Sequence, residues 1–380
     1  MKMKDWKEYR LGEMIQCNPQ VKLEKGKTYN LIDIDSIEIG SRYVKGKELT
    51  EYDGQSGCHF QNGDTVMARI TPCLENGKIA QVQCESQKGF GSTELFVFRG
   101  TENKTDSDYV FNLMSMQFIR NLAANSMTGA SGRQRADLGF IKRIKWNFPP
   151  LPTQQKIASI LSAYDNLIQN YKKQIEALQT GTCELYKEWF VRFRFPGWQN
   201  ANFENGIPEG WKVEKVKDCV NRLPFGQTYK KDELEPEGKV IVIDQSEDEY
   251  LGYHNNEPSH TASPENPIAL FGDHSCKYKL MIKDFSLGEN IIPYISKGVD
   301  LYYLYYSVYK IVQTEEYKRH WNLFVNKKVL IPNTELQKSF RQKVIPIFKQ
   351  IEILNKQITN LTQQRDLLLP RLMSGKLEVE

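Results

Sequence analysis

The sequence predicts an α+β protein built as a duplicated unit, in which a globular part followed by a long helix occurs twice. Two long segments carry apolar residues at alternating steps of three and four, which places a narrow apolar stripe along a helix. Each segment follows a strand-rich stretch, and both stretches open and close with similar short motifs. A stripe that narrow is best buried against another helix, so we expect the two segments to pair.

The two stripes occur in segments 151–196 and 333–380. In the second segment, Pro346 lacks an amide proton and is expected to delay the regular helix until about Ile347. Arg365 falls in the stripe and must reach solvent or find a carboxylate. The residues expected to pair the helices are Ile157, Leu161, Ile168, Ile175 and Leu178 in the first segment, and Ile347, Ile351, Leu354, Ile358 and Leu361 in the second.

Short motifs outside the helices support the duplication. The first motif, Asp5-Trp6-Lys7, recurs as Gly210-Trp211-Lys212. The second motif, Leu151-Pro152 followed by Gln155-Lys156, recurs as Ile331-Pro332 followed by Gln337-Lys338. The globular stretches between these motifs differ in length. Matching ends with differing middles indicate one scaffold that carries two different binding parts.

Each globular part is predicted to mix strands and a helix. In the first, alternating apolar residues and turn signals predict strands at 31–39, 65–69, 78–82 and 94–98, a helix at 109–124 and a closing strand at 141–148. In the second, the order repeats with strands at 239–244 and 267–272, a helix at 301–313 and a closing strand at 322–331.

Bulk properties fit a multi-domain binding protein of a reducing compartment. A chain of 380 residues should form two or three cores. Seven cysteines, an odd number without a Cys-x-x-Cys pair, argue against a disulfide framework and favour a cytoplasmic location. We expect no signal peptide and no membrane span, because no apolar run is long enough. The net charge of +4 permits nucleic-acid binding without requiring it.

Catalytic and metal motifs are weak. A Gly-rich cofactor turn that opens a helix is missing, and the only Pro-Pro pair, Pro149-Pro150, lacks the preceding Asn or Asp of an amino-methyltransferase. Glu237-Gly238-Lys239 has the outline of a metal-dependent nuclease site, but such a triplet arises often by chance. The spacing of His254, His260, His274 and Cys276 matches no metal site. These observations favour a binding or scaffold protein without metal or catalytic residues.

Four segments resemble a known family. They are 147–161 (NFPPLPTQQKIASIL), 63–80 (GDTVMARITPCLENGKIA), 270–274 (LFGDH) and 369–377 (LPRLMSGKL). On these segments the chain resembles, over essentially its whole length, the DNA-specificity subunit of type I restriction-modification systems.

The resemblance implies two target-recognition domains, 1–150 and 197–332, held apart by an antiparallel coiled coil of two conserved helical regions, 151–196 and 333–380, with a pseudo-two-fold internal repeat. Each domain would read one half of a split double-stranded DNA site. Partner subunits would supply the rest: two modification subunits with adenine methyltransferase activity and S-adenosylmethionine, and restriction subunits that use ATP and Mg. The chain itself would be non-catalytic and bind no cofactor. The alternatives are a stand-alone DNA-modifying or DNA-cleaving enzyme, and a coiled-coil scaffold without DNA contact.

Basic residues near predicted loops are the candidates for DNA contact, because cations bind phosphates and long polar side chains reach base edges. A Gly-rich run, 129–132, lies beside two of the arginines and would let the backbone approach a phosphate. The candidates are Arg69, Lys78, Lys88, Arg133, Gln134 and Arg135 in the first part, and Lys230, Lys231, His274, Lys277, Lys279, Lys318 and Arg319 in the second.

Overall fold

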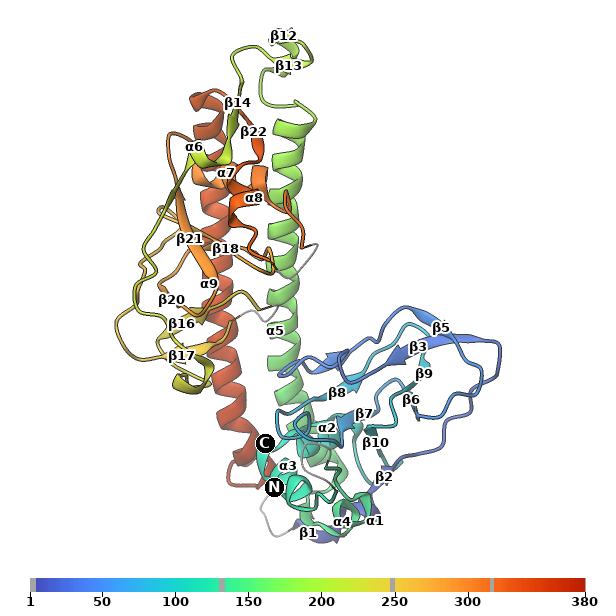
Figure 1. Cartoon of the computed structure of the whole chain (residues 1–380). Coiled ribbons are helices and arrows are strands. Elements are labelled where there is room, and N and C mark those ends of the chain that lie inside the picture. The colour runs from blue at the N-terminus through green and yellow to red at the C-terminus, as the bar shows by residue number, and fades with distance from the viewer. Residues whose placement is uncertain (1–4, 130–133, 247–249, 315–317, 380) are drawn as a thin grey trace. The chain divides into compact units, whose positions relative to one another are not determined.

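A computed structural model of the chain describes residues 5–129, 134–246, 250–314 and 318–379. It divides into two compact units, Met1–Asn170 with Ile358–Glu380 and Tyr171–Gln357. Each unit holds a β-rich domain and part of two long helices, α5 (Leu151–Tyr186) and α9 (Thr334–Met373) (Figure 1). The α+β class predicted from the sequence is confirmed.

The β-rich domain of the first unit contains a five-stranded sheet of order β2-β10-β7-β8-β4, a four-stranded sheet of order β5-β3-β9-β6 and a terminal pair, β1-β11. Helix α2 packs against β7, β8 and β10. The elements are β1 (Lys7–Arg10), α1 (Leu11–Met14), β2 (Ile15–Cys17), β3 (Thr28–Ile32), β4 (Tyr43–Val44), β5 (Leu49–Glu51), β6 (Cys58–Gln61), β7 (Thr65–Ala68), β8 (Ile79–Val82), β9 (Lys88–Gly91), β10 (Leu95–Gly100), α2 (Ser107–Ser115), α3 (Gln117–Asn125), α4 (Leu138–Arg143) and β11 (Lys145–Phe148).

The β-rich domain of the second unit has sheets of order β15-β21-β18-β19 and β17-β16-β20, with the pairs β14-β22 and β12-β13. Its elements are β12 (Phe203–Glu204), β13 (Ile207–Pro208), β14 (Lys212–Lys215), α6 (Val216–Cys219), β15 (Val220–Arg222), β16 (Val240–Ile243), β17 (Gly252–His254), β18 (Ile268–Gly272), β19 (Tyr278–Met281), β20 (Phe285–Leu287), β21 (Ile291–Ser296), α7 (Leu301–Val308), α8 (Trp321–Val325) and β22 (Lys328–Ile331).

The two domains repeat one fold at the level of strand register. Strand order β2-β10-β7-β8 corresponds to β15-β21-β18-β19, and β3, parallel to β9 and antiparallel to β5, corresponds to β16, parallel to β20 and antiparallel to β17. Opening and closing strands pair in the same way, with Lys7 opposite Phe148 and Lys212 opposite Ile331. The match of the two Trp-Lys motifs is thereby confirmed.

The predicted match at the closing ends is wrong by three positions. Because Phe148 and Ile331 share a register, Phe148-Pro149, and not Leu151-Pro152, repeats Ile331-Pro332. A buried glutamine follows at the same distance in each half, Gln154 and Gln337, and its side-chain amide donates to the carbonyl of Pro149 (2.9 Å) or Pro332 (2.8 Å). In each half, the side-chain oxygen of this glutamine also accepts from the backbone amide of the aspartate that caps the domain helix. That aspartate is Asp106 for α2 and Asp300 for α7.

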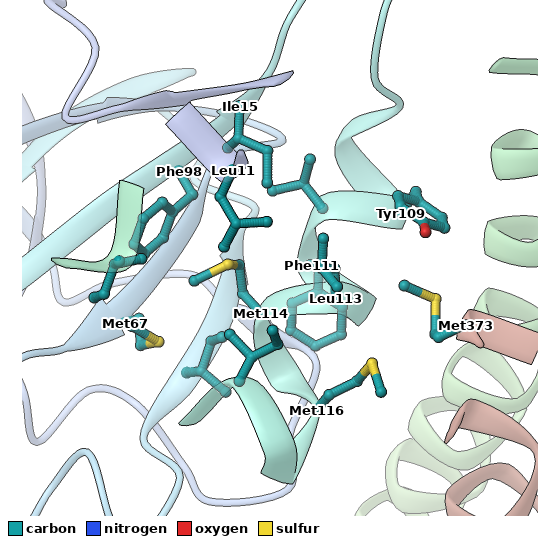
Figure 2. Packing of buried hydrophobic residues seen from close by; sticks show 14 of the residues in the cluster. Leu11, Ile15, Met67, Phe98, Tyr109, Phe111, Leu113, Met114, Met116 and Met373 are labelled. Atoms are coloured by element: carbon teal, nitrogen blue, oxygen red, sulfur yellow. The ribbon is translucent and has the colours of Figure 1, made fainter. Parts of the chain in front are cut away.

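The largest core of the first unit joins its domain to both helices. Leu11, Met67, Phe98 and Met114 are buried in it, and Met373 at the end of α9 points into the same cluster (Figure 2). Apolar residues from α1, β7, β10 and α2 therefore meet one face of α5 and the last turn of α9, which secures the domain to the start of one helix and the end of the other.

The helices pack antiparallel within the first unit. Ile157 and Leu161 share the core with Leu372 and Met373, and further along α5 Asp165 binds Arg365, which lies nearer the start of α9. In the second unit, Ile175 and Leu178 share a cluster with Ile347 and Ile351, rich in aromatic rings. Of the residues expected to pair the helices, Ile157, Leu161, Ile168, Ile351 and Leu354 are buried, and Ile175, Leu178, Ile347, Ile358 and Leu361 are half-buried.

Helix α9 differs from the expectation at Pro346. The helix begins at Thr334 and runs through Pro346 without a break. Packing of Phe340, Val344 and Phe348 into the aromatic cluster outweighs the one backbone hydrogen bond that proline cannot donate. Arg365 behaves as expected, because it finds a carboxylate.

Other predicted boundaries were wrong for local reasons. The helix expected at 109–124 is two helices, α2 and α3, because the backbone of Met116 is not helical (φ −60°, ψ 132°). The helix expected at 301–313 ends at Val308. Both closing strands start later than predicted, because the short helices α4 and α8 precede them. The strand expected at 31–39 is β3, which ends at Ile32.

Candidate nucleic-acid interface

A groove opens in the first unit where β7 ends and β10 begins, here called groove 1. Arg69 follows β7, and its backbone amide donates to the carbonyl of Glu94 (2.9 Å), just before β10. Its own carbonyl accepts from the amide of Ala136 (2.8 Å), which brings the chain before α4 to the same place. Groove 1 has a volume of about 440 Å³ and is lined by Asn18, Lys22, His59, Arg69 and Thr93, among others.

The guanidinium of Arg69, in the lining of groove 1, stacks on an aromatic ring. It lies 4.9 Å from the centre of the Phe96 ring, and its buried Nε has no hydrogen-bond partner among the residues that the structure describes. A planar group held on a ring and with unused donors is well suited to a phosphate or a guanine edge.

Arg135, beside groove 1, differs from Arg69 because it is paired with a carboxylate. Its guanidinium donates to both carboxylate oxygens of Glu94, at 2.5 to 3.0 Å. This hydrogen bonding lowers the pKa of Glu94, so the pair stays ionised at neutral pH. The carboxylate therefore neutralises Arg135 and would compete with a phosphate for it.

The second unit has a groove at the equivalent place, where β18 ends and β21 begins, here called groove 2. The amide of Asp273 donates to the carbonyl of Asn290 (2.8 Å), and the amide of His320 donates to the carbonyl of Asp273 (2.7 Å). These bonds repeat those of Arg69 in the first unit. Groove 2 has a volume of about 490 Å³, and its lining includes Arg222, Phe225, Asp273, Glu289, Asn290, Arg319 and Trp321.

Groove 2 has the same pattern of backbone hydrogen bonds as groove 1 but different side chains. Asp273 stands where the first unit has Arg69, and its carboxylate accepts from the amide of Trp321 (2.9 Å) and lies 3.8 Å from Arg319. The Arg319 side chain is 80% exposed. Arg222 stacks on Phe225 at 4.7 Å. The two grooves thus present different patterns of donors and acceptors.

The structure brings some of the predicted residues together and separates others. Arg69 lines groove 1, with Gln134 and Arg135 beside it, and Arg319 lines groove 2. The ammonium of Lys78 instead donates to the carbonyl of Ile34 (3.0 Å). Lys88 is exposed on β9, in the other sheet.

In the second unit, the remaining predicted residues lie apart from the lining of groove 2. Lys230 and Lys231 are exposed at a short 3-10 turn, and Lys277 donates to the carbonyl of Ser246 (2.7 Å). His274 and Lys279 belong to the hairpin of β18 and β19, and Lys318 is exposed next to Arg319. Arg133 and residues 130–132 of the Gly-rich run lie outside the described residues.

Arg222 was missed by the sequence reasoning. It lies as far beyond Trp211 as Cys17 lies beyond Trp6, so extending the match of the Trp-Lys motifs would have placed it in the strand equivalent to β2, while its place in a groove needed the structure.

Two buried histidines of the second unit have structural surroundings. His254 stacks on Tyr229, its Nδ1 accepts from the amide of Asn256 (3.1 Å), and its Nε2 lies 2.9 Å from the Ser286 hydroxyl. Burial lowers the pKa of His254 and of His260 below the ordinary value.

Among the described residues no group of three His, Cys, Asp or Glu could hold a metal ion. None of the described helices is long and apolar enough to cross a bilayer.

Comparisons with known proteins agree with this geometry. A family described as the type I restriction modification DNA specificity domain matches residues 3–180. The MjaVIII specificity subunit of Methanocaldococcus jannaschii is 23% identical, with 99% of this chain and 94% of the relative covered. The HindI specificity subunit of Haemophilus influenzae is 21% identical, with 99% and 100% covered. The crystal structure of an S subunit from M. genitalium has the same fold, at 15% identity and a TM-score of 0.52, with 99% and 97% of the two chains covered.

Two β-rich domains on packed long helices, together with relatives matched along nearly their whole length, define a DNA-recognition subunit of a larger system. Residues 3–180 match the family of type I restriction modification DNA specificity domains, and along nearly its whole length the chain is similar to specificity subunits of type I restriction-modification systems, a non-catalytic class.

Proposed function

We propose that this subunit reads a bipartite DNA site, one half with each recognition domain. The observation that carries the proposal is the repeated backbone frame of grooves 1 and 2, which bear different side chains. A shared frame can present each domain to duplex DNA in the same way, while different donors and acceptors select different bases. The proposed domains are 1–150 and 197–332, with helical regions 151–196 and 333–380 between and after them.

The helices would fix the distance between the half-sites. At about 1.5 Å per residue, the 36 residues of α5 and the 40 residues of α9 extend about 54 and 60 Å. Packed helices of that length are stiff, so two half-sites would be read only across a constant number of uncontacted base pairs.

Affinity would come from cations around the grooves and specificity from the groove floors. Arg69 and Arg319 are the leading candidates, because both line a groove. The other proposed DNA-contacting residues are Lys78, Lys88, Arg133, Gln134, Arg135, Lys230, Lys231, His274, Lys277, Lys279 and Lys318.

The chemistry would belong to partner subunits in the cytoplasm. In this proposal, two modification subunits methylate adenine with S-adenosylmethionine, and restriction subunits use ATP and Mg to cleave unmodified DNA. The full-length match to specificity subunits supports this division of labour.

The test is to express the chain with the modification subunit of its own system and to map methylated adenines on a random DNA library. We expect one motif of two short parts with a constant gap. Arg69→Ala should weaken selection in one part and Arg319→Ala in the other, while Arg143→Ala, an exposed arginine outside both grooves, should change neither. Uniform methylation or a single contiguous motif would refute the proposal, and methylation or cleavage by the purified chain alone would establish the stand-alone enzyme instead.

A further inference from the structure

A buried ionic network joins the first recognition domain to both long helices. Asp165 of α5 is 3% exposed, and one of its carboxylate oxygens accepts from Arg42 of the domain (3.1 Å) while the other accepts from Arg365 of α9 (2.8 Å). The Arg42 side chain is 1% exposed and also binds Gln81 and Asp108. One carboxylate therefore connects three elements that are remote in sequence.

Neighbouring residues extend the contact along α5. The Tyr43 hydroxyl donates to Asn166 (3.1 Å), and the side-chain amide of Gln169 donates to the Ser41 hydroxyl (3.1 Å). Three consecutive residues, Ser41 and Arg42 before β4 and Tyr43 at its start, thus meet a single stretch of the helix. Such a set of directional bonds defines one position along α5 and one rotation about it.

The internal repeat shows that the fold does not need charge at this place. Asp165 lies eleven residues beyond Gln154, and the residue eleven positions beyond Gln337 is Phe348. Phe348 is 7% exposed and packs on Tyr302, with ring centres 5.0 Å apart. The second unit thus buries an apolar contact where the first buries ions, and the adjacent Lys349 makes only an exposed ion pair with Glu265 (2.6 Å). Buried ion pairs contribute little net stability but can specify one arrangement.

The geometry also shows how little movement the network tolerates. One added base pair shifts a half-site by about 3.4 Å and rotates it by about 35°. The Arg42–Asp165 bond, at 3.1 Å, is lost after a displacement of about 1 Å. The domain therefore cannot follow a half-site displaced by one base pair while the network stays intact.

We propose that Arg42, Asp165 and Arg365 are positioning residues that fix the first recognition domain on the helix pair and so determine the number of base pairs between the half-sites. The inference rests on the bipartite reading proposed above. Arg42 and Arg365 touch no DNA in it. They act by holding the domain in one register on α5.

The test uses the complex with its modification subunit and duplexes that contain both half-sites with the natural gap, one base pair fewer or one more. The main variant replaces the network with apolar groups of similar size, Arg42→Met, Asp165→Leu and Arg365→Met together. We expect the preference for the natural gap, measured as a ratio of methylation rates, to fall about tenfold or more, while the bases selected within each half-site stay the same. Lys356→Met, which removes an exposed ion pair with Glu352 on α9, is the matched control and should keep the preference.

A folded triple variant with the wild-type gap preference would overturn the inference. Should the triple variant fail to fold, Asp165→Asn retains the shape of the side chain, and an unchanged preference in that folded variant overturns it equally. A wild-type complex that selects two half-sites with a variable gap also overturns it. A wild-type complex that selects no bipartite sequence contradicts the bipartite function itself, which separates the two failures.

Discussion

Replacing Gln154 by alanine should strongly destabilise the first unit. The side chain is fully buried, and its amide nitrogen donates to the carbonyls of Pro149 (2.9 Å) and Lys104 (3.0 Å), while its oxygen accepts from the amide of Asp106 (3.1 Å). A buried hydrogen bond contributes about 1 kcal/mol, so the loss of three predicts about 3 kcal/mol. At about 2–4 °C per kcal/mol for a unit of roughly 150–250 residues, the melting transition of the first unit should fall by about 6–12 °C.

The assay is differential scanning calorimetry of the full chain, with Gln155→Ala as the control. Gln155 is exposed and adjacent, so the same chemical change should shift the transition by no more than about 2 °C. Gln337→Ala should lower the transition of the second unit by about 4–8 °C, because two hydrogen bonds of its side chain are lost. If Gln154→Ala and Gln155→Ala had the same melting temperature, the buried glutamine would not stabilise the junction between the closing strand and the long helix.

Three further predictions follow from contacts in the grooves and cores. Glu94→Gln should release Arg135, strengthen non-specific duplex binding and steepen its salt dependence by about one unit of slope, as measured by fluorescence anisotropy across a salt series; an unchanged slope would contradict the competition between Glu94 and phosphate. Folding lowers the pKa of His254, so the unfolded chain binds a proton at a higher pH than the folded chain does. The free energy of unfolding of the second unit should therefore decrease as the pH falls below about 6.5. Urea unfolding at pH 7.5 and 5.5 should show this loss in the second unit, and His254→Gln should reduce it. Phe340→Ala, which leaves a cavity among Tyr186, Trp189 and Phe190, should destabilise the second unit by about 3–5 kcal/mol in the same assay, whereas Lys338→Ala on the exposed side of α9 should not.

The long helices and the duplication could be predicted because their signals are local and regular. The apolar spacing marked both long helices, although α9 begins before Pro346 and not near Ile347, and the Trp-Lys motifs gave the true register of the opening strands. The closing ends were misaligned because proline and glutamine recur within a few residues there, so several matches look equally good. Only strand pairing shows which of them share a position.

The candidate site was harder to predict because basic residues in loops look alike in sequence. Arg69 and Lys78 both appeared available, yet Lys78 caps a carbonyl inside its own domain while the guanidinium of Arg69 keeps unused donors in a groove. The pairing of Arg135 with Glu94 joins residues 41 positions apart, which no spacing rule indicates. For the same reason, the contact of Arg42 with Asp165 required tertiary structure.

Each recognition domain leaves its scaffold through one strand and returns through the strand beside it, β1 with β11 and β14 with β22. Whatever length of chain lies between these neighbours, the following long helix starts from the same point. A lineage could therefore exchange or resize the intervening segment, and so acquire a new target sequence, provided that the residues that meet α5 and α9, such as Arg42, are kept.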